Sequence, residues 1–295
     1  MTKIKLITDS GSDISWEKAE KLGIRMLPIS FTFDGKTYYR EGIDMTKEEF
    51  FSKLAQKDSP IPKTAQVTPV QFADAFNEEM DNGYDTLIVV TISSAASGMH
   101  QNAVMMAQEV MEERGGEIVV IDSHGFSCMY GGAVVHAAHM LNEGKGKDEI
   151  LAYFDDVIGS MKPYFLVGDL EHLKKGGRIN TATLVIASML DINPLLTVKD
   201  GLVVQKDKIR GGKNLLKKLV KNIAADGYNL SGKTIFIAHS AMEEKASDVI
   251  SEIESEFAGA KFLPYCIGPV IGCHGGPDLI GVIFSDKYNF EYYED

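Results

Sequence analysis

The chain has 295 residues, of which 44% are hydrophobic and 24% are charged, and its formal net charge is −12. Length and composition are typical of a globular protein with about two domains, each large enough to bury a core without metals or disulfides. The negative charge argues against general binding of nucleic acid, because an acidic surface repels the phosphate backbone.

The first half of the chain alternates predicted strands and helices. Three continuous apolar runs predict buried strands, at Lys3 to Thr8, Thr86 to Thr91 and Glu117 to Ile121. Two local signals indicate helix starts, since Thr46 forms a capping box with Glu49 and Thr68 stands directly before a proline. Long apolar strands separated by helices favour a parallel sheet that is covered on both faces.

Two segments interrupt this alternation. Asp34-Gly35 predicts a hairpin between the runs Arg25 to Phe33 and Lys36 to Tyr39. Further along, the polar, glycine-rich segment Gly144 to Lys147 precedes a predicted helix, Asp148 to Met161. We expect this helix to link the two halves of the chain.

The second half mixes strands, a hairpin and helices in a less regular order. Asp200-Gly201 predicts a hairpin within Leu195 to Val204. Helices are expected at Ala182 to Leu190, Leu215 to Ala225 and Glu243 to Phe257, and further strands at Tyr164 to Val167, Thr234 to Ala238, Lys261 to Cys266 and Leu279 to Phe284. We therefore predict a two-domain α/β protein, with a parallel-sheet α/β domain over residues 1–160 and a mixed-sheet α+β domain over residues 161–295.

The cysteines and the hydropathy pattern indicate the compartment. Cys128, Cys266 and Cys273 show no CxxC spacing, which argues against a disulfide framework and fits a reducing cytosol. The chain starts directly with a strand-like run, and no stretch approaches ~20 uninterrupted apolar residues. We expect a cytoplasmic protein without a transmembrane segment, for which transient contact with a membrane stays open.

The segment after the second apolar strand, residues 91–98, is rich in hydroxyl groups and starts a helix. Open α/β sheets bind ligands at the carboxyl ends of their strands, and a helix start favours an anion through its free N–H groups and its dipole. Ser93, Ser94, Ser97 and Gly98 are therefore candidate ligand-binding residues. Simple N-capping by one serine stays open as the other interpretation.

Three more segments combine polar groups with small residues. Thr64, in segment 63–66, could give a hydroxyl to a ligand or cap a turn. The run 174–179 is basic and glycine-rich but lacks the spacing of a P-loop, so a solvated turn is its simpler interpretation. The run 267–277 reads as a loop whose four glycines and two prolines shape the backbone for close approach, and His274 stands at its centre.

Common catalytic and metal motifs are missing from the sequence. There is no GxSxG elbow, no GxGxxG after a strand and no HExxH. His136 and His139 lie three apart on a predicted helix, but the sequence indicates no third metal ligand. We therefore expect neither a metal site nor a cofactor.

Taken together, these motifs resemble those of the DegV family, in the same order along the whole chain. The segments that carry the resemblance are Thr8 to Ser10, Lys63 to Gln66, Ser93 to Gly98, Asp122-Ser123, Leu173 to Ile179, Ile192 to Leu196 and Gly268 to His274. No single motif is decisive, but seven in sequence make coincidence improbable.

The resemblance implies an α/β N-terminal domain, a second domain with a mixed sheet, and a cleft between them that holds one long-chain fatty acid. It implies a carrier and not an enzyme, which presents the carboxylate of the acid to a separate fatty-acid kinase subunit. By the same resemblance, Thr64 and the serines would hold the carboxyl group, with Ser94 as first choice and Ser97 as second.

The resemblance also assigns three residues of the second half. His274 would support the head-group network, Arg178 would brace that site or hold its own glycine turn, and Arg210 is the candidate for the kinase-facing surface. Two alternatives stay open. One is an enzyme that uses a Ser/His pair for acyl or phosphoryl transfer, for which the sequence offers no orienting acid. The other is a regulatory module that binds another small acidic ligand.

Overall fold

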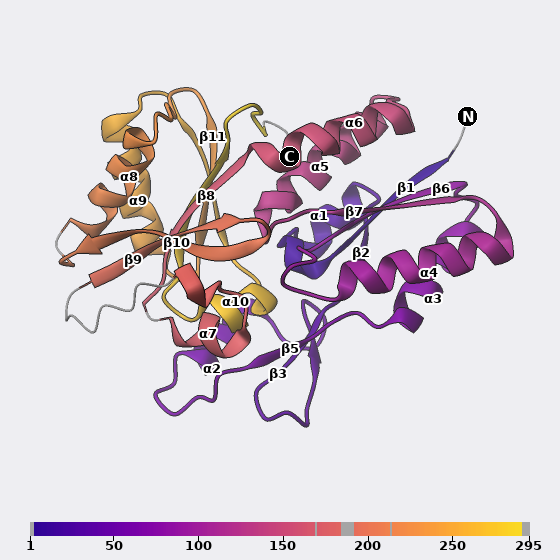
Figure 1. Cartoon of the computed structure of the whole chain (residues 1–295), viewed down its shortest axis with the longest axis horizontal. Coiled ribbons are helices and arrows are strands. Elements are labelled where there is room, and N and C mark those ends of the chain that lie inside the picture. The colour runs from indigo at the N-terminus through magenta and orange to yellow at the C-terminus, as the bar shows by residue number, and fades with distance from the viewer. Residues whose placement is uncertain (1–2, 169, 184–191, 213, 291–295) are drawn as a thin grey trace.

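The computed structural model describes residues 3–168, 170–183, 192–212 and 214–290, and this part of the chain is built around three sheets (Figure 1). A four-stranded sheet with the order β2-β1-β6-β7 forms the centre of the first half. Its strands are β1 (Ile4–Asp9), β2 (Arg25–Leu27), β6 (Thr86–Thr91) and β7 (Glu117–Asp122). All pairs are parallel and every residue of β6 is buried, which confirms the predicted parallel sheet.

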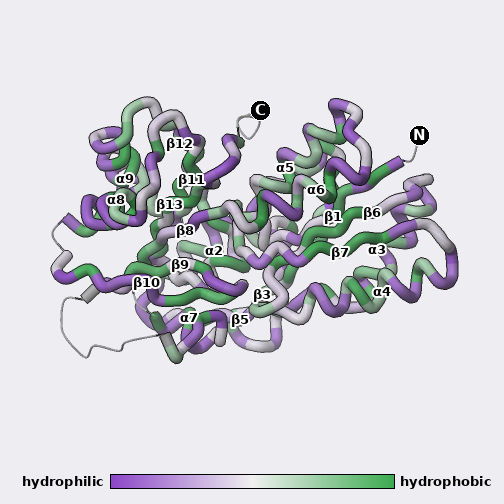
Figure 2. Tube along the Cα trace, turned by 45° about the horizontal axis from the view of Figure 1, so that its top comes forward, coloured by the Kyte–Doolittle hydropathy of each residue, from purple (hydrophilic) through white to green (hydrophobic). Residues whose placement is uncertain are grey.

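Helices cover both faces of this sheet, with α3 and α4 on one face and α5 and α6 on the other (Figures 1 and 2). The helices of this half are α1 (Trp16–Lys21), α2 (Lys47–Leu54), α3 (Pro69–Asp81), α4 (Met99–Arg114), α5 (Cys128–Asn142) and α6 (Lys147–Val157). Both α2 and α3 start where the sequence predicts, because capping boxes at Thr46 and Thr68 satisfy N–H groups that the first turn leaves free.

The run from Arg25 to Phe33 is not one strand, contrary to the prediction. Its first residues form β2, whereas β3 (Ser30–Thr32) joins a small antiparallel sheet with β4 (Tyr39–Arg40) and β5 (Lys63–Ala65). Pro28 separates the two pieces, because proline has no N–H with which to continue a ladder. The predicted hairpin is confirmed, since β3 and β4 pair across the turn at Asp34-Gly35.

The second half is built on a six-stranded mixed sheet with the order β10-β9-β8-β13-β11-β12. Its strands are β8 (Met161–Leu166), β9 (Ile192–Lys199), β10 (Leu202–Arg210), β11 (Thr234–His239), β12 (Lys261–Cys266) and β13 (Ile280–Ser285). Only the β11–β12 pair is parallel among the described ladders of this sheet. The prediction of a mixed sheet in this half is therefore confirmed.

The two faces of this sheet have different neighbours. Helices α8 (Leu215–Ala225) and α9 (Glu243–Glu256) pack on one face, where alternate residues such as Tyr164, Ile280 and Val282 form a core with them. The opposite face turns toward the first half, where Phe236 and Ile283 join the larger core. Since side chains alternate along a strand, each strand serves both environments.

Shorter elements complete the described part of the chain. They are the helices α7 (Glu171–Gly176) and α10 (Pro269–Gly275) and the 3-10 turns Ser10–Ser12, Ile158–Ser160 and Thr181–Thr183. Most of the helix predicted at Ala182 to Leu190 lies outside the described residues. Helix α10 contradicts the interpretation of the run 267–277 as a loop, and its contacts explain why it forms, as described below.

Candidate functional site

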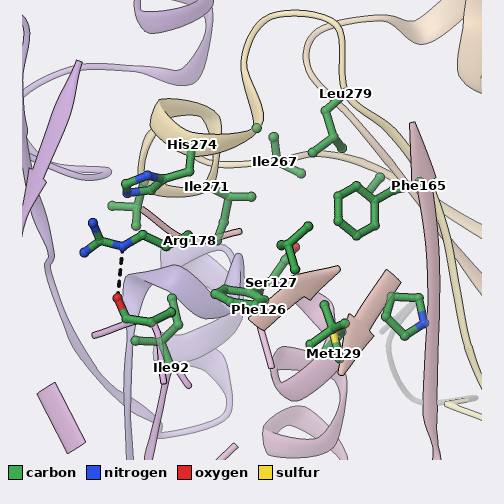
Figure 3. A pocket seen from close by; sticks show the side chains of 18 of the residues that line it. Ile92, Phe126, Ser127, Met129, Phe165, Arg178, Ile267, Ile271, His274 and Leu279 are labelled. Atoms are coloured by element: carbon green, nitrogen blue, oxygen red, sulfur yellow. Dashed lines mark hydrogen bonds between the residues drawn. The ribbon is translucent and has the colours of Figure 1, made fainter. Parts of the chain in front are cut away.

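A cavity of about 250 Å³ lies between the two halves of the molecule (Figure 3). The first half lines it with the segments that follow β6 and β7, and the second half lines it with the inner face of the mixed sheet and with α10. The apolar part of the wall includes Ile92, Phe126, Met129, Phe165, Ile271 and Leu279. The cavity therefore suits a ligand that is largely apolar.

Polar groups of both halves meet at one side of this cavity. Thr64 Oγ1, on β5, and His274 Nε2, on α10, lie 3.0 Å apart. Ser97, Gln66 and Arg178 line the same cavity. Figure 3 shows His274 and Arg178 on the side opposite Phe165, so the cavity has a polar end and an apolar end.

The imidazole of His274 is neutral at neutral pH. Burial lowers its pKa to about 4, and the nearby charge of Arg178 acts in the same direction. Among the described residues its Nδ1 has no hydrogen-bond partner. A Cβ at position 176 would lie 2.2 Å from that Nδ1, so only glycine at this position leaves room for the ring.

Arg178 is half-buried in the cavity wall and does not stand in a solvated turn. Gly177 ends α7 in the left-handed conformation (φ 72°), and the chain then turns inward. The Arg178 guanidinium donates through Nε to the carbonyl of Ala96 (2.9 Å, Figure 3) and through Nη1 to the carbonyl of Gly176. The first of these bonds ties the serine segment to the second half.

The three serines of this segment lie in three environments. Ser97 lines the cavity. Ser93 is buried and donates its hydroxyl to the carbonyl of Gly201 (2.7 Å), in the turn between β9 and β10. Ser94 is exposed, and both its N–H and its hydroxyl bind Asp122. Neither Ser93 nor Ser94 is part of the cavity wall, so the structure favours Ser97 over Ser94, the first choice from the sequence.

Gly98 stands beside the cavity without lining it. A Cβ at this position would lie 2.9 Å from Oε1 of Gln66, so the glycine lets that side chain reach the wall. Ser97 Oγ also accepts a long hydrogen bond from the Met99 N–H (3.4 Å), so it combines a position in the cavity with weak capping of α4. Sequence reasoning did not single out Gln66, although it belongs to the segment around Thr64.

Two buried carboxyl groups of the first half hold the start of α10. Asp13 accepts from the N–H of Gly268 (2.7 Å), and Glu41 accepts from the N–H of Val270 (3.0 Å). Burial raises the pKa of both groups, that of Glu41 to about 8, and the Asp13 charge raises the pKa of Glu41 further. These acceptors satisfy N–H groups that a helix start leaves free, which is why a glycine-rich run becomes a helix that carries His274.

Ser127 connects the cavity to this carboxyl pair. Its backbone adopts φ 57° and ψ −142°, a region that side-chain-bearing residues rarely occupy. Its hydroxyl binds Asp13 and lies 2.7 Å from the hydroxyl of Tyr265, on β12. No local sequence signal marked Glu41 or Ser127, because their partners come from distant parts of the chain; Asp13 belongs to the polar run that ends the first strand.

Other predicted features lie away from the cavity. Arg210 is exposed at the end of β10, where its carbonyl accepts from the Lys218 ammonium. His136 packs its ring against Tyr153 (centroids 4.9 Å apart). Within the described ranges, no group of three or more His, Cys, Asp or Glu side chains could hold a metal ion. In the same ranges, no helix is both long enough and apolar enough to span a bilayer.

Comparison with known proteins places the chain among relatives of similar length. Residues 3–287 match the family profile described as "Uncharacterised protein, DegV family". A DegV domain-containing protein from Caldanaerobacter subterraneus subsp. tengcongensis is 32% identical over 287 residues, which cover 97% of this chain and 100% of the relative.

Two solved structures share both the fold and a part of the sequence. One is a DegV family protein from Thermus thermophilus described for its fatty acid binding, with 29% identity, a TM-score of 0.85, and coverage of 96% of this chain and 100% of the other. The second is a stearic-acid-binding protein from Eubacterium ventriosum, with 27% identity, a TM-score of 0.87, and coverage of 99% and 100%. The α/β fold, with a parallel sheet first and a mixed sheet second, is thus confirmed, and the chain belongs to the DegV family.

Proposed function

We propose that this protein binds one long-chain fatty acid in the cavity between its halves and presents the carboxylate to a separate fatty-acid kinase subunit. In this proposal residues 1–160 and 161–295 act as the two domains of a cytoplasmic carrier. The observation that carries it is a cavity with a largely apolar wall and a polar end to which both halves contribute. The fatty acid binding described for the two structural relatives gives independent support.

The polar end has the chemistry that a carboxylate needs. If Nε2 of the neutral His274 carries the proton, it donates to Thr64 Oγ1, and the Thr64 hydroxyl hydrogen is then free to donate to a ligand. This tautomer leaves Nδ1 as an unpaired acceptor instead of an unpaired buried donor, which is the less costly arrangement. Ser97 adds a second hydroxyl and Arg178 adds a fixed positive charge beside it.

The apolar wall accounts for affinity. About 14 methylenes gain roughly 0.8 kcal/mol each on burial, or ~11 kcal/mol in total. Ordering and association subtract several kcal/mol, so micromolar to nanomolar binding is expected. The polar end would then fix the orientation of the acid, since a buried carboxylate without partners is very costly.

A catalytic role for His274 has less support from the site. A general base in a Ser/His pair needs an orienting acid beside its second nitrogen. In the described part of the chain, Nδ1 of His274 has no hydrogen-bond partner, and the charge beside the ring is that of Arg178. The imidazole is therefore neutral, and no acid orients it or stabilises its protonated form. These properties suit a hydrogen-bonding group for a ligand better than a general base.

The presentation step requires a surface that a kinase subunit can reach. We keep Arg210 in this role, because it is exposed at the end of β10, the strand that contributes Val203 to the cavity wall. An Arg210→Ala variant should then keep its bound acid and lose phosphorylation of that acid in the presence of the kinase. Equal losses of binding and phosphorylation would argue against this assignment.

Denaturing mass spectrometry of an organic extract from the purified, undelipidated protein tests the binding proposal. We expect a stoichiometric C14 to C18 fatty acid in the wild type and a reduced amount in Thr64→Val, which removes one hydroxyl and keeps the shape. Thr37→Val, a change in the exposed turn after β3, is the matched control and should retain the acid. Absence of lipid from the wild type, before and after incubation with fatty acid, would contradict the proposal.

A further inference from the structure

On the sheet face that forms the floor of the cavity, one of the lining residues is a glycine, Gly281. Three neighbouring strands of the mixed sheet, β11, β13 and β8, place Ala238, Gly281 and Phe165 directly beside one another in register. All three residues line the cavity. Along this row the side chains are a methyl group, a hydrogen atom and a phenyl ring, so Gly281 places no side chain between Ala238 and Phe165.

The backbone does not require glycine at position 281. Its φ lies outside the left-handed region in which several other glycines of the chain are found. Glycine inside a strand loses packing and costs conformational entropy, so such a residue often marks a close approach by a ligand. The flanking residues Ile280 and Val282, which face α8 and α9, are fully buried aliphatic side chains typical of a central strand.

A small side chain would nevertheless fit at this position. A Cβ built on Gly281 would lie 3.3 Å from Cβ of Phe165, 3.6 Å from Cβ of Ala238 and 3.8 Å from Cδ1 of Ile283. Only the contact with Phe165 is tighter than usual, and a shift of a few tenths of an ångström relieves it. Neither the contacts nor the backbone conformation therefore excludes alanine at position 281. The space that a side chain would fill there is part of the cavity.

This space lies toward the apolar end. Figure 3 shows Phe165 on the side opposite His274 and Arg178, and Gly281 is the register neighbour of Phe165. A ligand anchored by its carboxylate near His274 would therefore direct its acyl chain toward the Ala238–Gly281–Phe165 row.

We propose that Gly281, together with Ala238, sets the length of acyl chain that the cavity accepts. This inference rests on the proposed binding of a fatty acid. Any side chain at position 281 would occupy volume that the last methylenes of a long acid need, while a shorter acid anchored at the same polar end would still fit.

The test compares Gly281→Ala and Gly281→Val with the wild type, each delipidated and titrated with saturated acids of 12, 14, 16 and 18 carbons. The ratio of the Kd values for the 18- and 14-carbon acids is the readout. Each methylene that no longer fits should cost about fourfold in affinity. We expect the affinity for the 18-carbon acid relative to the 14-carbon acid to fall about fourfold in Gly281→Ala and at least about tenfold in Gly281→Val, with 14-carbon binding nearly unchanged.

The matched control is Gly159→Ala, the same chemical change at a position with open space around it and no contact with the cavity. It should leave the ratio unchanged. If Gly281→Val does not fold, Gly281→Ala still decides the question, because its added methyl fits the strand. If the Gly281 variants bind all chain lengths equally more weakly, or if the ratio of Kd values does not change, the inference is overturned. The proposed function stands in that case as long as the wild type binds fatty acids. Failure of the wild type to bind any of the acids would remove both.

Discussion

The two large sheets contribute to the same cavity in different ways. The parallel sheet contributes at its edge, where the segments after β6 and β7 bring Ser97, Phe126 and Ser127 to the wall. The mixed sheet contributes with a face, where alternate residues of β8 and β13, such as Phe165 and Gly281, form the floor. An edge of parallel strands exposes loops and helix starts, which can be polar, whereas a sheet face between two packed layers stays apolar.

This difference gives the two sheets different roles. The edge loops recognise the carboxylate, and the sheet face sets which acyl chains fit. The edge loops are held in place by buried polar groups, as when Asp9 accepts from the N–H of Ile92 (2.8 Å) at the start of the serine segment. The face needs no such support, because its shape follows from which side chains are large and which are small. We therefore expect changes at the polar end to alter affinity for every acid, and changes on the sheet face to alter the choice among acids.

The largest effect should follow from loss of the imidazole at the polar end. His274→Ala removes the partner of Thr64 and opens a space beside Arg178. Without the imidazole nothing orients the Thr64 hydroxyl toward the ligand, and a hydrogen bond to a charged group contributes about 1.5–3 kcal/mol, so affinity for fatty acids should fall about 10- to 100-fold at every chain length. Isothermal titration with 14- and 18-carbon acids measures this, and His124→Ala, an exposed residue outside the cavity wall, is the control. A loss of affinity that depends on chain length would contradict the division of roles between the polar end and the sheet face.

A smaller effect is expected at the carboxyl pair that holds α10. The pKa of Glu41 is raised to about 8, so the folded state keeps a proton that the unfolded state loses near pH 4.5. The contribution of this group to stability is therefore full below pH 4.5 and falls as the pH rises toward 8. Glu41→Gln cannot ionise and should be more stable than the wild type above pH 8, by on the order of 1 kcal/mol, with little difference below pH 4.5.

Thermal unfolding between pH 4 and 9 measures this difference. Glu149→Gln is the control, because Lys145 and the Gly146 N–H lower the pKa of that exposed carboxyl and its replacement should give no gain at high pH. Parallel stability curves for Glu41→Gln and the wild type would mean that the folded and unfolded states bind the Glu41 proton equally, so that folding does not raise the pKa of this group. The start of α10 would then be held by a charged carboxylate at neutral pH and not by a neutral hydrogen-bonding group.

The smallest effect distinguishes two serines of the same segment. Ser97→Ala removes a hydroxyl from the cavity wall and should weaken fatty acid binding about fivefold, since a neutral hydrogen bond contributes about 1 kcal/mol. Ser94→Ala affects only the bond to Asp122 and should change affinity less than about twofold. A larger loss of affinity in Ser94→Ala than in Ser97→Ala would mean that the segment rearranges when the ligand binds.

Several elements followed directly from local sequence signals. The capping boxes at Thr46 and Thr68 start α2 and α3 where predicted, and the apolar run from Thr86 to Thr91 is strand β6. The hairpin at Asp200-Gly201 joins β9 to β10. These signals work because a cap, a turn or a continuous apolar strand depends on residues that are close in sequence.

Other elements depended on partners that the sequence does not place. The split of Arg25 to Phe33 between two sheets, and the helix within 267–277, require contacts with β1, β5, Asp13 and Glu41. A glycine-rich run has no strong local preference, so distant acceptors decide its conformation.

The sequence by itself determined most of the strands and helices, the class of the fold, and several of the segments from which the cavity is built. The tertiary structure alone decided which residue of each segment faces the cavity: Ser97 and not Ser94, Arg178 as a wall residue, and Gly281 on the inner face of β13. The physical reason is that a one-residue shift in register, or a bond to a residue a hundred positions away, turns a side chain from one environment to another. Local propensity is the same in both cases, so only the packing of the two halves distinguishes them.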